Sequence, residues 1–131
     1  MNVVAAVIER NGRILICQRK RGEKHAFKWE FPGGKVEPGE DSPTALAREL
    51  REELALDAKI GALLHTETVR YSNGPPLHLE FFHVTEFQDE PVNLQFAQIV
   101  WIERVSLPSY DFLEGDFAFI KKLANPAPDG T

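Results

Sequence analysis

The sequence predicts an α/β sandwich, in which a mixed and mostly antiparallel sheet lies between helices. Short β-prone runs bounded by turn signals alternate with segments whose apolar residues recur at helical spacing. The elements follow the order β-β-loop-α-β-β-β-α, which is typical of this class. With 131 residues, 43% of them hydrophobic, the chain suits one domain, which we place at residues 1–125. Residues 126–131, "PAPDGT", are expected to form a flexible tail.

A β-hairpin opens the predicted sheet. The runs "VVAAVIE" and "RILICQR" are joined by Arg10-Asn11-Gly12, and an Asn-Gly pair favours a tight turn because both residues tolerate positive φ. Cys17 is the only cysteine and lies in the second run, so we expect a buried thiol and no intrachain disulfide. The basic, aperiodic segment 20–28, "KRGEKHAFK", is predicted to be an exposed loop that is able to meet a phosphate.

The first helix is predicted to begin at Pro43, after a cap at Asp41 or Ser42. Its core-facing positions recur at spacings of three and four residues: Ala47, Leu50 and Leu54. Strands follow at about residues 59–70 and 77–87, separated by the turn "SNGPP", and "QIVWI" is a further short strand. The segment "EGDFAFIKKLAN" predicts a last amphipathic helix with three apolar residues at helical spacing: Phe117, Ile120 and Ala124.

Charge and hydrophobicity limit the partners and the location. The formal net charge of -5 disfavours binding to a polyanion such as nucleic acid. No apolar run approaches about 18 residues and no basic leader precedes the first one, so we expect neither membrane insertion nor export. A lone cysteine without a partner fits a cytoplasmic setting.

Glu49, Glu52 and Glu53 lie at i, i+3 and i+4 of the first predicted helix, so their carboxylates emerge on one face. Such a stripe has two interpretations: a solvated acidic face balanced by neighbouring arginines, or a cation site. Gly33 and Gly34 favour the second, because a sharp turn there brings backbone carbonyls near the carboxylates and creates the oxygen-only surroundings that Mg²⁺ prefers. A Mg²⁺ ion on a polyphosphate neutralises the leaving group and activates water, as hydrolysis of a phosphoanhydride requires.

The segment "GKVEPGEDSPTALARELREELAL" resembles the Nudix box, G-x5-E-x7-R-E-U-x-E-E-x-G-U, in which U is apolar. The matching positions are Gly34, Glu40, Arg48, Glu49, Leu50, Glu52, Glu53 and Leu56. Ala55 stands where the pattern has glycine, so the turn that ends the helix is in question rather than the charged positions. Similarity to the MutT branch continues in "VVAAVIERNGRILICQR", "WEFPGGKVEPGE" and "IVWI", and is greatest to its CTP pyrophosphohydrolase and 8-oxo-dGTP diphosphatase types.

This resemblance implies the Nudix sandwich and conversion of a nucleoside triphosphate and water to monophosphate and pyrophosphate, with Mg²⁺, or Mn²⁺ in its place, as cofactor. It implies that Glu52 and Glu53 hold the metal with the carbonyl of Gly33. Glu49 would assist the metal or the attacking water. Arg48 would form ion pairs that lock the helix, and Gly34 and Glu40 would support the loop. Arg19 and Lys35 would bind phosphate; the alternative for these two residues is that they are ordinary charged surface residues.

Glu30, Arg70 and Asp116 match the base-recognition residues of the same branch. Each has a structural alternative: pairing of Glu30 with a lysine two residues earlier, an exposed strand end for Arg70, and a helix cap for Asp116. Two ionised carboxylates offer only acceptors and suit a guanine edge. Cytosine needs one acceptor and one donor, the donor coming from Arg70 or from a carboxylic acid kept protonated by its neighbour. Cytidine nucleotides and oxidised purine nucleotides such as 8-oxo-dGTP are both retained as expected substrates.

The family often supplies one more carboxylate from a late loop, before the strand that holds Trp101. Here that region, "NLQFAQIVW", contains Gln95 and Gln98 but no acid. Either metal affinity is reduced, or Glu49 acts as the base without help. The alternative function is a catalytically weak Nudix module that binds a nucleotide or a protein partner. The expected partner is a small nucleoside triphosphate, with no nucleic-acid polymer and no membrane, and the expected assembly is a monomer or a homodimer.

Overall fold

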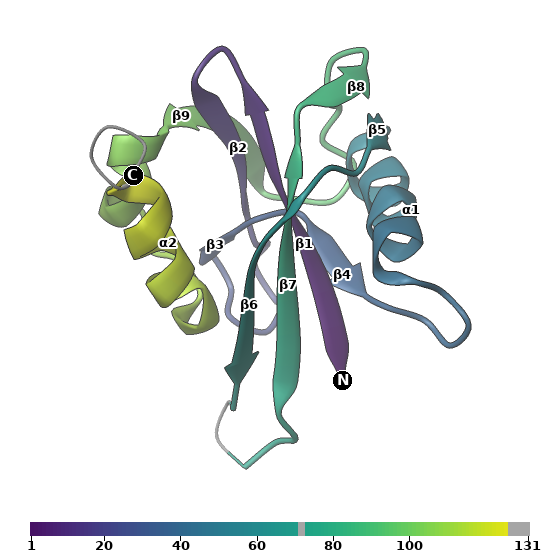
Figure 1. Ribbon diagram of the computed structural model, residues 1–131. Coiled ribbons are helices and arrows are strands. Elements are labelled where there is room, and N and C mark those ends of the chain that lie inside the picture. Colours follow the sequence, from purple (N-terminus) through teal and green to yellow (C-terminus); the bar gives the residue numbers. More distant parts are fainter. Residues whose placement is uncertain (71–72, 126–131) are drawn as a thin grey trace.

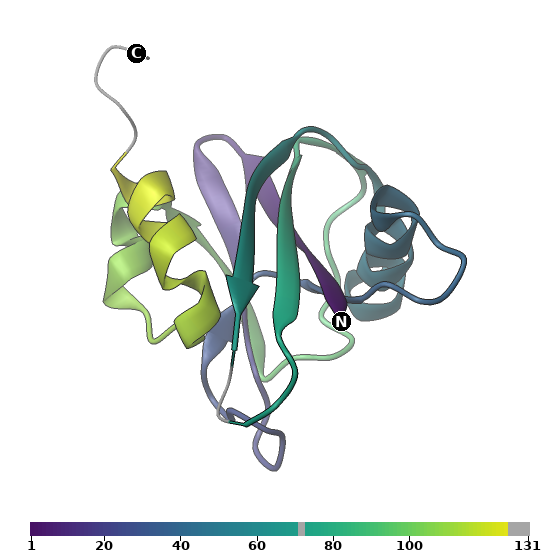
Figure 2. The same cartoon turned by 60° about the horizontal axis from the view of Figure 1, so that its bottom comes forward.

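The computed structural model of the chain describes residues 1–70 and 73–125. Helices α1 (Ser42–Leu54) and α2 (Phe117–Ala124) cover opposite faces of a central sheet, and two views agree on this placement (Figures 1 and 2). The predicted α/β sandwich is therefore confirmed. Within the described ranges, no helix is long and apolar enough to cross a membrane. The tail expected at residues 126–131 lies outside the described residues.

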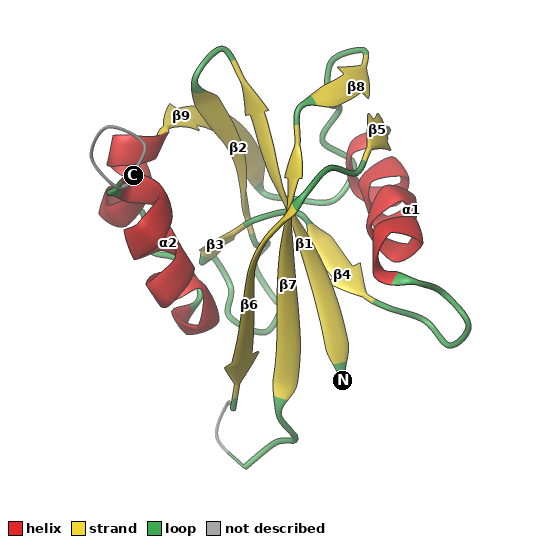
Figure 3. Cartoon of the chain, viewed as in Figure 1, coloured by secondary structure: helices red, strands yellow, loops and turns green. Residues whose placement is uncertain are grey.

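The main sheet is mixed and mostly antiparallel, as predicted. Its strands follow the order β3-β2-β1-β7-β6, with β4 added to β1 and β9 added to β2 (Figure 3). Strands β1 and β7 run parallel, and the other pairs of this sheet run antiparallel. The bounds are β1 (Asn2–Arg10), β2 (Arg13–Gln18), β3 (Trp29–Glu30), β4 (Gly33–Lys35), β6 (Leu63–Val69), β7 (Leu77–Val84) and β9 (Gln98–Glu103). The short strands β3 and β4 were not predicted.

The opening hairpin has the predicted turn. Asn11 and Gly12 adopt φ values of 55° and 76°, which turn the chain tightly so that Arg10 pairs with Arg13. Along β2, successive side chains point to opposite faces of the sheet, so the strand contributes to both cores. Leu15 and Cys17 pack on the α1 side, whereas the residues between and before them pack on the α2 side. The thiol of Cys17 is fully buried, as expected.

The two cores divide the apolar residues of the helices. On the α1 side, Ala45, Leu46, Leu50 and Leu54 pack against the sheet, while Ala47 is half-buried at the edge. On the α2 side, the packed residues are Phe119, Ile120 and Leu123. Phe117 was placed on the apolar face of this helix, but its side chain is 54% exposed. The prediction failed there because Phe117 is the first residue of α2, directly after the 3₁₀ turn η2 (Glu114–Asp116), and the buried face of the helix is formed by Phe119, Ile120 and Leu123.

The two long strands predicted after α1 are each divided in the structure. Residues 59–70 contribute to β5 (Asp57–Lys59) and β6, and residues 77–87 contribute to β7 and β8 (Glu86–Gln88), with β5 and β8 forming a separate antiparallel pair. The break lies at Gly61, whose N–H donates to the carbonyl of His83 at 2.9 Å. A Cβ at Gly61 would lie 2.6 Å from that oxygen, so this crossing requires glycine. Part of the turn predicted from "SNGPP" lies outside the described residues.

Candidate active site

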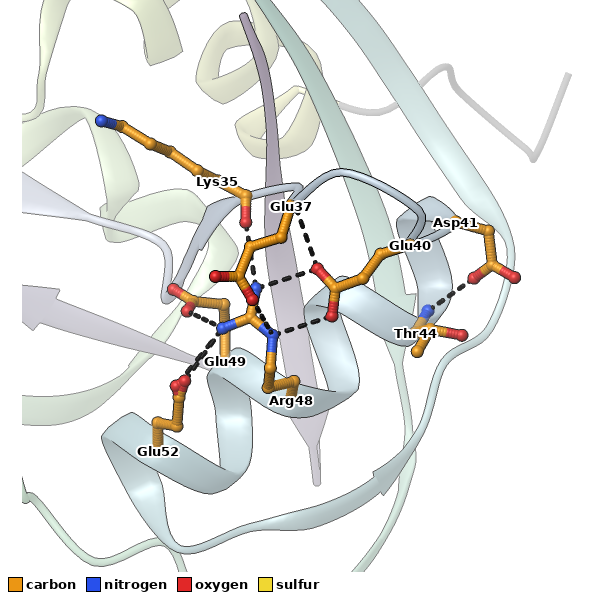
Figure 4. Close-up of polar contacts among 8 residues, drawn as sticks. All are labelled: Lys35, Glu37, Glu40, Asp41, Thr44, Arg48, Glu49 and Glu52. Atoms are coloured by element: carbon orange, nitrogen blue, oxygen red, sulfur yellow. Dashed lines mark hydrogen bonds and ion pairs between the residues drawn. The ribbon is translucent and has the colours of Figure 1, made fainter.

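Helix α1 is fixed at both ends. The carboxylate of Asp41 accepts the N–H of Thr44 at 2.8 Å, so Asp41 rather than Ser42 is the cap (Figure 4). At the other end, Ala55 adopts the left-handed conformation, with φ 51° and ψ 35°, and its N–H donates to the carbonyl of Arg51 at 3.1 Å. The turn for which the motif uses glycine therefore forms with alanine, at a cost of about 1–2 kcal/mol.

Arg48 lies at the centre of the acidic helix face and contacts carboxylates on both sides (Figure 4). Its Nη1 donates to Glu49 at 2.8 Å and to Glu52 at 2.9 Å. Its Nε and Nη2 donate to the two oxygens of Glu40 at 2.8 and 3.0 Å, and Nη2 also reaches the carbonyl of Lys35 at 3.1 Å. This single guanidinium thus ties the helix to the loop that precedes it.

Gly33 and Gly34 allow strand β4 to lie against both β1 and helix α1. A Cβ at Gly33 would lie 2.0 Å from the carbonyl oxygen of Val4, and one at Gly34 would lie 1.7 Å from Oε2 of Glu49. The N–H of Gly33 donates to Oε1 of Glu53 at 3.2 Å. A side chain at Gly34 would therefore displace the carboxylate of Glu49, whereas one at Gly33 would collide with the backbone of β1.

The electrostatics of this cluster favour a cation. Glu53 is only 7% exposed, and burial, reinforced by the charge of Glu49, raises its pKa to about 9. Burial also raises the pKa of Glu49. The carboxyl oxygens and nearby carbonyls form a donor set that suits a hard divalent cation, which would stabilise the ionised forms. Among the described residues, no three acidic, His or Cys side chains are close enough to hold an ion as they stand, and Glu52 is engaged by Arg48.

A cleft of about 540 Å³ begins at this cluster and extends along the sheet. Glu53, Gly33 and Gly34 line one part of it, together with Lys35. Elsewhere the lining includes Arg19, Glu30 and Asp116 beside three apolar side chains, Phe31, Phe81 and Leu113. Such a mixture of apolar walls and a few polar groups is typical of a site for a small organic ligand.

Glu30 and Asp116 form the second acidic pair of the cleft. Nη1 of Arg19 lies 3.2 Å from each carboxylate oxygen of Glu30, whereas Lys28 pairs with Asp111 at 2.8 Å. Asp116 is 7% exposed and its side chain makes no capping hydrogen bond to α2. Burial, with the charge of Glu30 adding to it, raises the pKa of Asp116 to about 8, so this acid is mainly neutral at pH 7. The pairing of Glu30 with Lys28 and the cap by Asp116 are thus excluded.

Comparison with known proteins identifies the chain. The family model described as the NUDIX domain matches residues 1–123. The chain belongs to the Nudix family. Nudix hydrolases generally need a divalent metal ion.

Curated relatives and solved structures agree with this family. The chain is 37% identical to the CTP pyrophosphohydrolase of Escherichia coli over 97% of each chain, and 36% identical to the 8-oxo-dGTP diphosphatase of Haemophilus influenzae over 93% of this chain and 90% of that protein. The E. coli ORF135 protein, solved in solution, superposes with a TM-score of 0.82 at 37% identity, covering 98% of this chain and 94% of that one. A MutT Nudix hydrolase from Burkholderia pseudomallei superposes equally well, with 0.82 at 27% identity over 92% and 95%.

Not every residue expected in the Nudix site lies in the cleft. Lys35 lines it beside the glycines, as a phosphate-binding residue would. Arg19 lines it too, but its guanidinium contacts Glu30. Arg70 directly follows β6, is exposed, and is not among the cleft-lining residues in the described ranges. The base-binding role of Arg70 stays a prediction without support from the cleft geometry.

The sequence did not reveal how the late segment joins the site. The N–H of Leu94 donates to the carbonyl of Glu53 at 3.0 Å, and the N–H of Val92 to the carbonyl of Leu54 at 2.8 Å. These bonds fasten the segment to the end of α1 and bring Gln95 and Phe96 into the cleft lining. Gln95 thus lines the same cleft as Glu53. The sequence signal for this was the position of Gln95 shortly before β9.

Proposed function

We propose that the protein is a Mg²⁺-dependent pyrophosphohydrolase that converts a nucleoside triphosphate and water to the monophosphate and pyrophosphate. The observation that carries this proposal is the acidic cluster at Gly33 and Gly34, where Glu53 and Glu49 are held against the backbone at one part of a cleft that also holds a second polar pair. The activities named for the E. coli and H. influenzae relatives support the same reaction.

In this proposal, Glu52 and Glu53 with the carbonyl of Gly33 hold the metal, and Glu49 assists it or accepts a proton from the attacking water. Mg²⁺ supplies charge neutralisation on the phosphates and a more acidic water, and Mn²⁺ has compatible oxygen ligands. Arg48 keeps the carboxylates on one side of the helix, and it would release Glu52 to the metal. Glu40 holds Arg48 in place from the loop.

Lys35 and the pair of Glu30 and Asp116 would hold the two ends of the substrate. Lys35 lines the cleft, and its amine would meet phosphate oxygens there. Glu30, paired with Arg19, offers a carboxylate acceptor, whereas the neutral carboxyl of Asp116 offers a donor. One acceptor and one donor match the N4 amine and N3 of cytosine, so we infer that cytidine triphosphates are preferred. An oxidised purine nucleotide such as 8-oxo-dGTP is the second substrate class, in line with the H. influenzae relative.

A second candidate function is that of a weakly catalytic module that binds a nucleotide or a protein. It is favoured by one observation, the neutral Gln95 at the position in the cleft where an added carboxylate would strengthen metal binding. The proposal further includes a cytoplasmic location, where nucleotides and Mg²⁺ are abundant and the buried Cys17 stays reduced, and a monomer or homodimer that binds neither nucleic-acid polymers nor membranes.

Product analysis tests the proposed reaction. The purified protein is incubated with CTP, dCTP, 8-oxo-dGTP and the other common triphosphates in Mg²⁺, and products are resolved by phosphorus NMR. We expect monophosphate and pyrophosphate, with cytidine nucleotides turned over best. Glu53→Gln is the control, because it keeps the shape of the side chain but removes its charge. Orthophosphate as the product would reject the reaction, and no release above Glu53→Gln with retained nucleotide binding would favour the binding module.

A further inference from the structure

Arg19 connects the loop 20–28 to the acidic pair of the cleft. Its backbone N–H donates to the carbonyl of Lys28 at 2.9 Å, and its own carbonyl accepts the N–H of Phe27 at 3.0 Å. Its Nε donates to the carbonyl of Lys24 at 2.8 Å, across the loop. Its Nη1 reaches both oxygens of Glu30 at 3.2 Å. One side chain therefore holds the loop and the carboxylate at the same time.

The loop needs such support because its backbone is strained. His25 and Phe27 adopt positive φ values of 58° and 67°, which non-glycine residues rarely occupy. Such conformations persist only where surrounding contacts fix them, and they are common at ligand sites. The amide of Gln18 adds a hydrogen bond to the carbonyl of Phe27 at 3.1 Å. The loop lines the cleft with Glu23, Lys24 and His25, so its position affects the shape of the site.

Glu30 also depends on Arg19. The carboxylate side chain of Glu30 is 18% exposed, and its charge adds to the raised pKa of the nearby Asp116. Burial disfavours the ionised form of Glu30, while the charge of Arg19 opposes this effect. Nη1 contacts both oxygens of Glu30 while Nε donates to the carbonyl of Lys24, so the planar guanidinium fixes the direction of the carboxylate relative to the loop. In contrast, the amine of Lys35 makes no ion pair within the described residues and is available to phosphates.

We propose that Arg19 is a positioning residue for base selection, which acts by fixing the carboxylate of Glu30 as a hydrogen-bond acceptor in the cleft and by holding the loop 20–28 beside it. The inference rests on the proposed nucleotide hydrolysis and adds a residue to its specificity. It differs from a phosphate-binding role, in which Arg19 would serve all triphosphates equally. The two roles make opposite predictions for a ligand that has a base but no phosphate.

A double-mutant cycle tests the proposal. Arg19→Gln, Glu30→Gln and the double variant are compared with the wild type for kcat and KM on the best substrate of the triphosphate panel and on the poorest one still hydrolysed. We expect each single substitution to lower the ratio of kcat/KM between these substrates by about tenfold, and the double variant to lower it no further. An equal loss on every base, or losses that multiply in the double variant, would overturn the proposal.

Nucleoside binding provides a readout that phosphate contacts do not affect. The nucleoside of the best substrate is titrated into wild type, Arg19→Gln and Arg21→Gln, and binding is followed by NMR chemical shifts. Arg21 is the matched control because it lies in the same loop, is exposed and does not line the cleft. We expect weaker binding in Arg19→Gln alone; unchanged binding in Arg19→Gln, or the same weakening in both variants, would reject the proposal.

Two controls separate the role of Arg19 from a folding defect and from a lack of nucleotide hydrolysis in the wild type. Thermal unfolding and amide NMR spectra check that Arg19→Gln is folded, and Arg19→Lys serves as the second variant because it keeps the charge but not the fork of donors. We expect Arg19→Lys to recover kcat while selectivity stays below that of the wild type; full recovery of selectivity would contradict the need for the fork. An inactive wild type would reject the proposed hydrolysis, whereas an active wild type with base-independent losses rejects only the role of Arg19.

Discussion

The carboxylate of Glu49 lies so close to the α-carbon of Gly34 that a Cβ there would be 1.7 Å from Oε2. Gly34→Ala should therefore displace Glu49 from the acidic cluster. We expect kcat to fall by about 100-fold, with a loss of about 1–3 kcal/mol in unfolding free energy, measured by steady-state kinetics and urea unfolding. Gly39→Ala is the control for stability loss alone: a Cβ at Gly39 meets no atom within 4 Å, but its φ of 86° costs alanine about 1–2 kcal/mol, so stability should fall without displacement of Glu49. Equal losses of activity in both variants would contradict this account.

Glu53→Gln should make the protein more stable without metal. The pKa of Glu53 is raised from 4.5 to about 9, so ionisation is harder in the fold than in the unfolded chain. Stability from this group is fully present below pH 4.5 and is lost as the pH rises toward about 9. We expect Glu53→Gln to gain roughly 1–2 kcal/mol at pH 8 in EDTA and nothing at pH 4. Thermal unfolding at pH 8 and at pH 4 measures these differences in stability. Mg²⁺ should stabilise the wild type more than the variant. Equal stabilisation of the two proteins by Mg²⁺ would argue against Glu53 as a ligand.

Ala55→Gly should stabilise the end of helix α1. Ala55 has a left-handed conformation, with φ 51°, which costs alanine about 1–2 kcal/mol and glycine almost nothing. Glycine has more conformational entropy than alanine in the unfolded chain, which offsets part of this gain. We therefore expect a net increase of about 0.5–1 kcal/mol in the free energy of unfolding, measured in urea. Ala47→Gly, inside the same helix, should lose about 1 kcal/mol instead. A less stable Ala55→Gly variant would show that other contacts of Ala55 outweigh its backbone strain.

Local patterns predicted the fold class, the hairpin at Asn11 and Gly12, and the acidic stripe of α1, because these features depend on neighbours within a few residues. The division of the long strands at Gly61 depends on its approach to His83, and no local signal encodes that contact. The sequence likewise did not predict the ion pair between Arg19 and Glu30, because a charge pattern shows which residues are cationic but not which acid each one contacts. The cleft brings together residues from the N-terminal strands and the late segment, and their distance along the chain conceals this.

Asp116→Asn should preserve base selectivity, whereas Asp116→Ala should remove it. An asparagine keeps a neutral group with one donor and one acceptor, as the protonated acid has. The pKa of Asp116 is about 8, so the wild type should lose selectivity for the preferred base as the pH rises from 7 to 9, while Asp116→Asn should not. The measurement is the ratio of kcat/KM for CTP and UTP at both pH values. An equal fall for every base in Asp116→Ala would assign Asp116 a purely structural role.

Gln95→Glu should tighten metal binding. Gln95 lines the cleft with Glu53, on a segment that is fastened to α1 by the hydrogen bond from Leu94 to the carbonyl of Glu53. A carboxylate there adds an oxygen ligand and a negative charge, so we expect the Mg²⁺ concentration for half-maximal activity to fall by about 3–10-fold. Gln98→Glu is the matched control, because Gln98 is exposed on β9, donates to Gln18 at 2.8 Å and does not line the cleft. An equal fall in the Mg²⁺ requirement of both variants would indicate a general effect of negative charge. A fall in Gln95→Glu alone would show that the missing acid weakens metal binding. An unchanged requirement would contradict this account and leave Glu49 as the base that works without help.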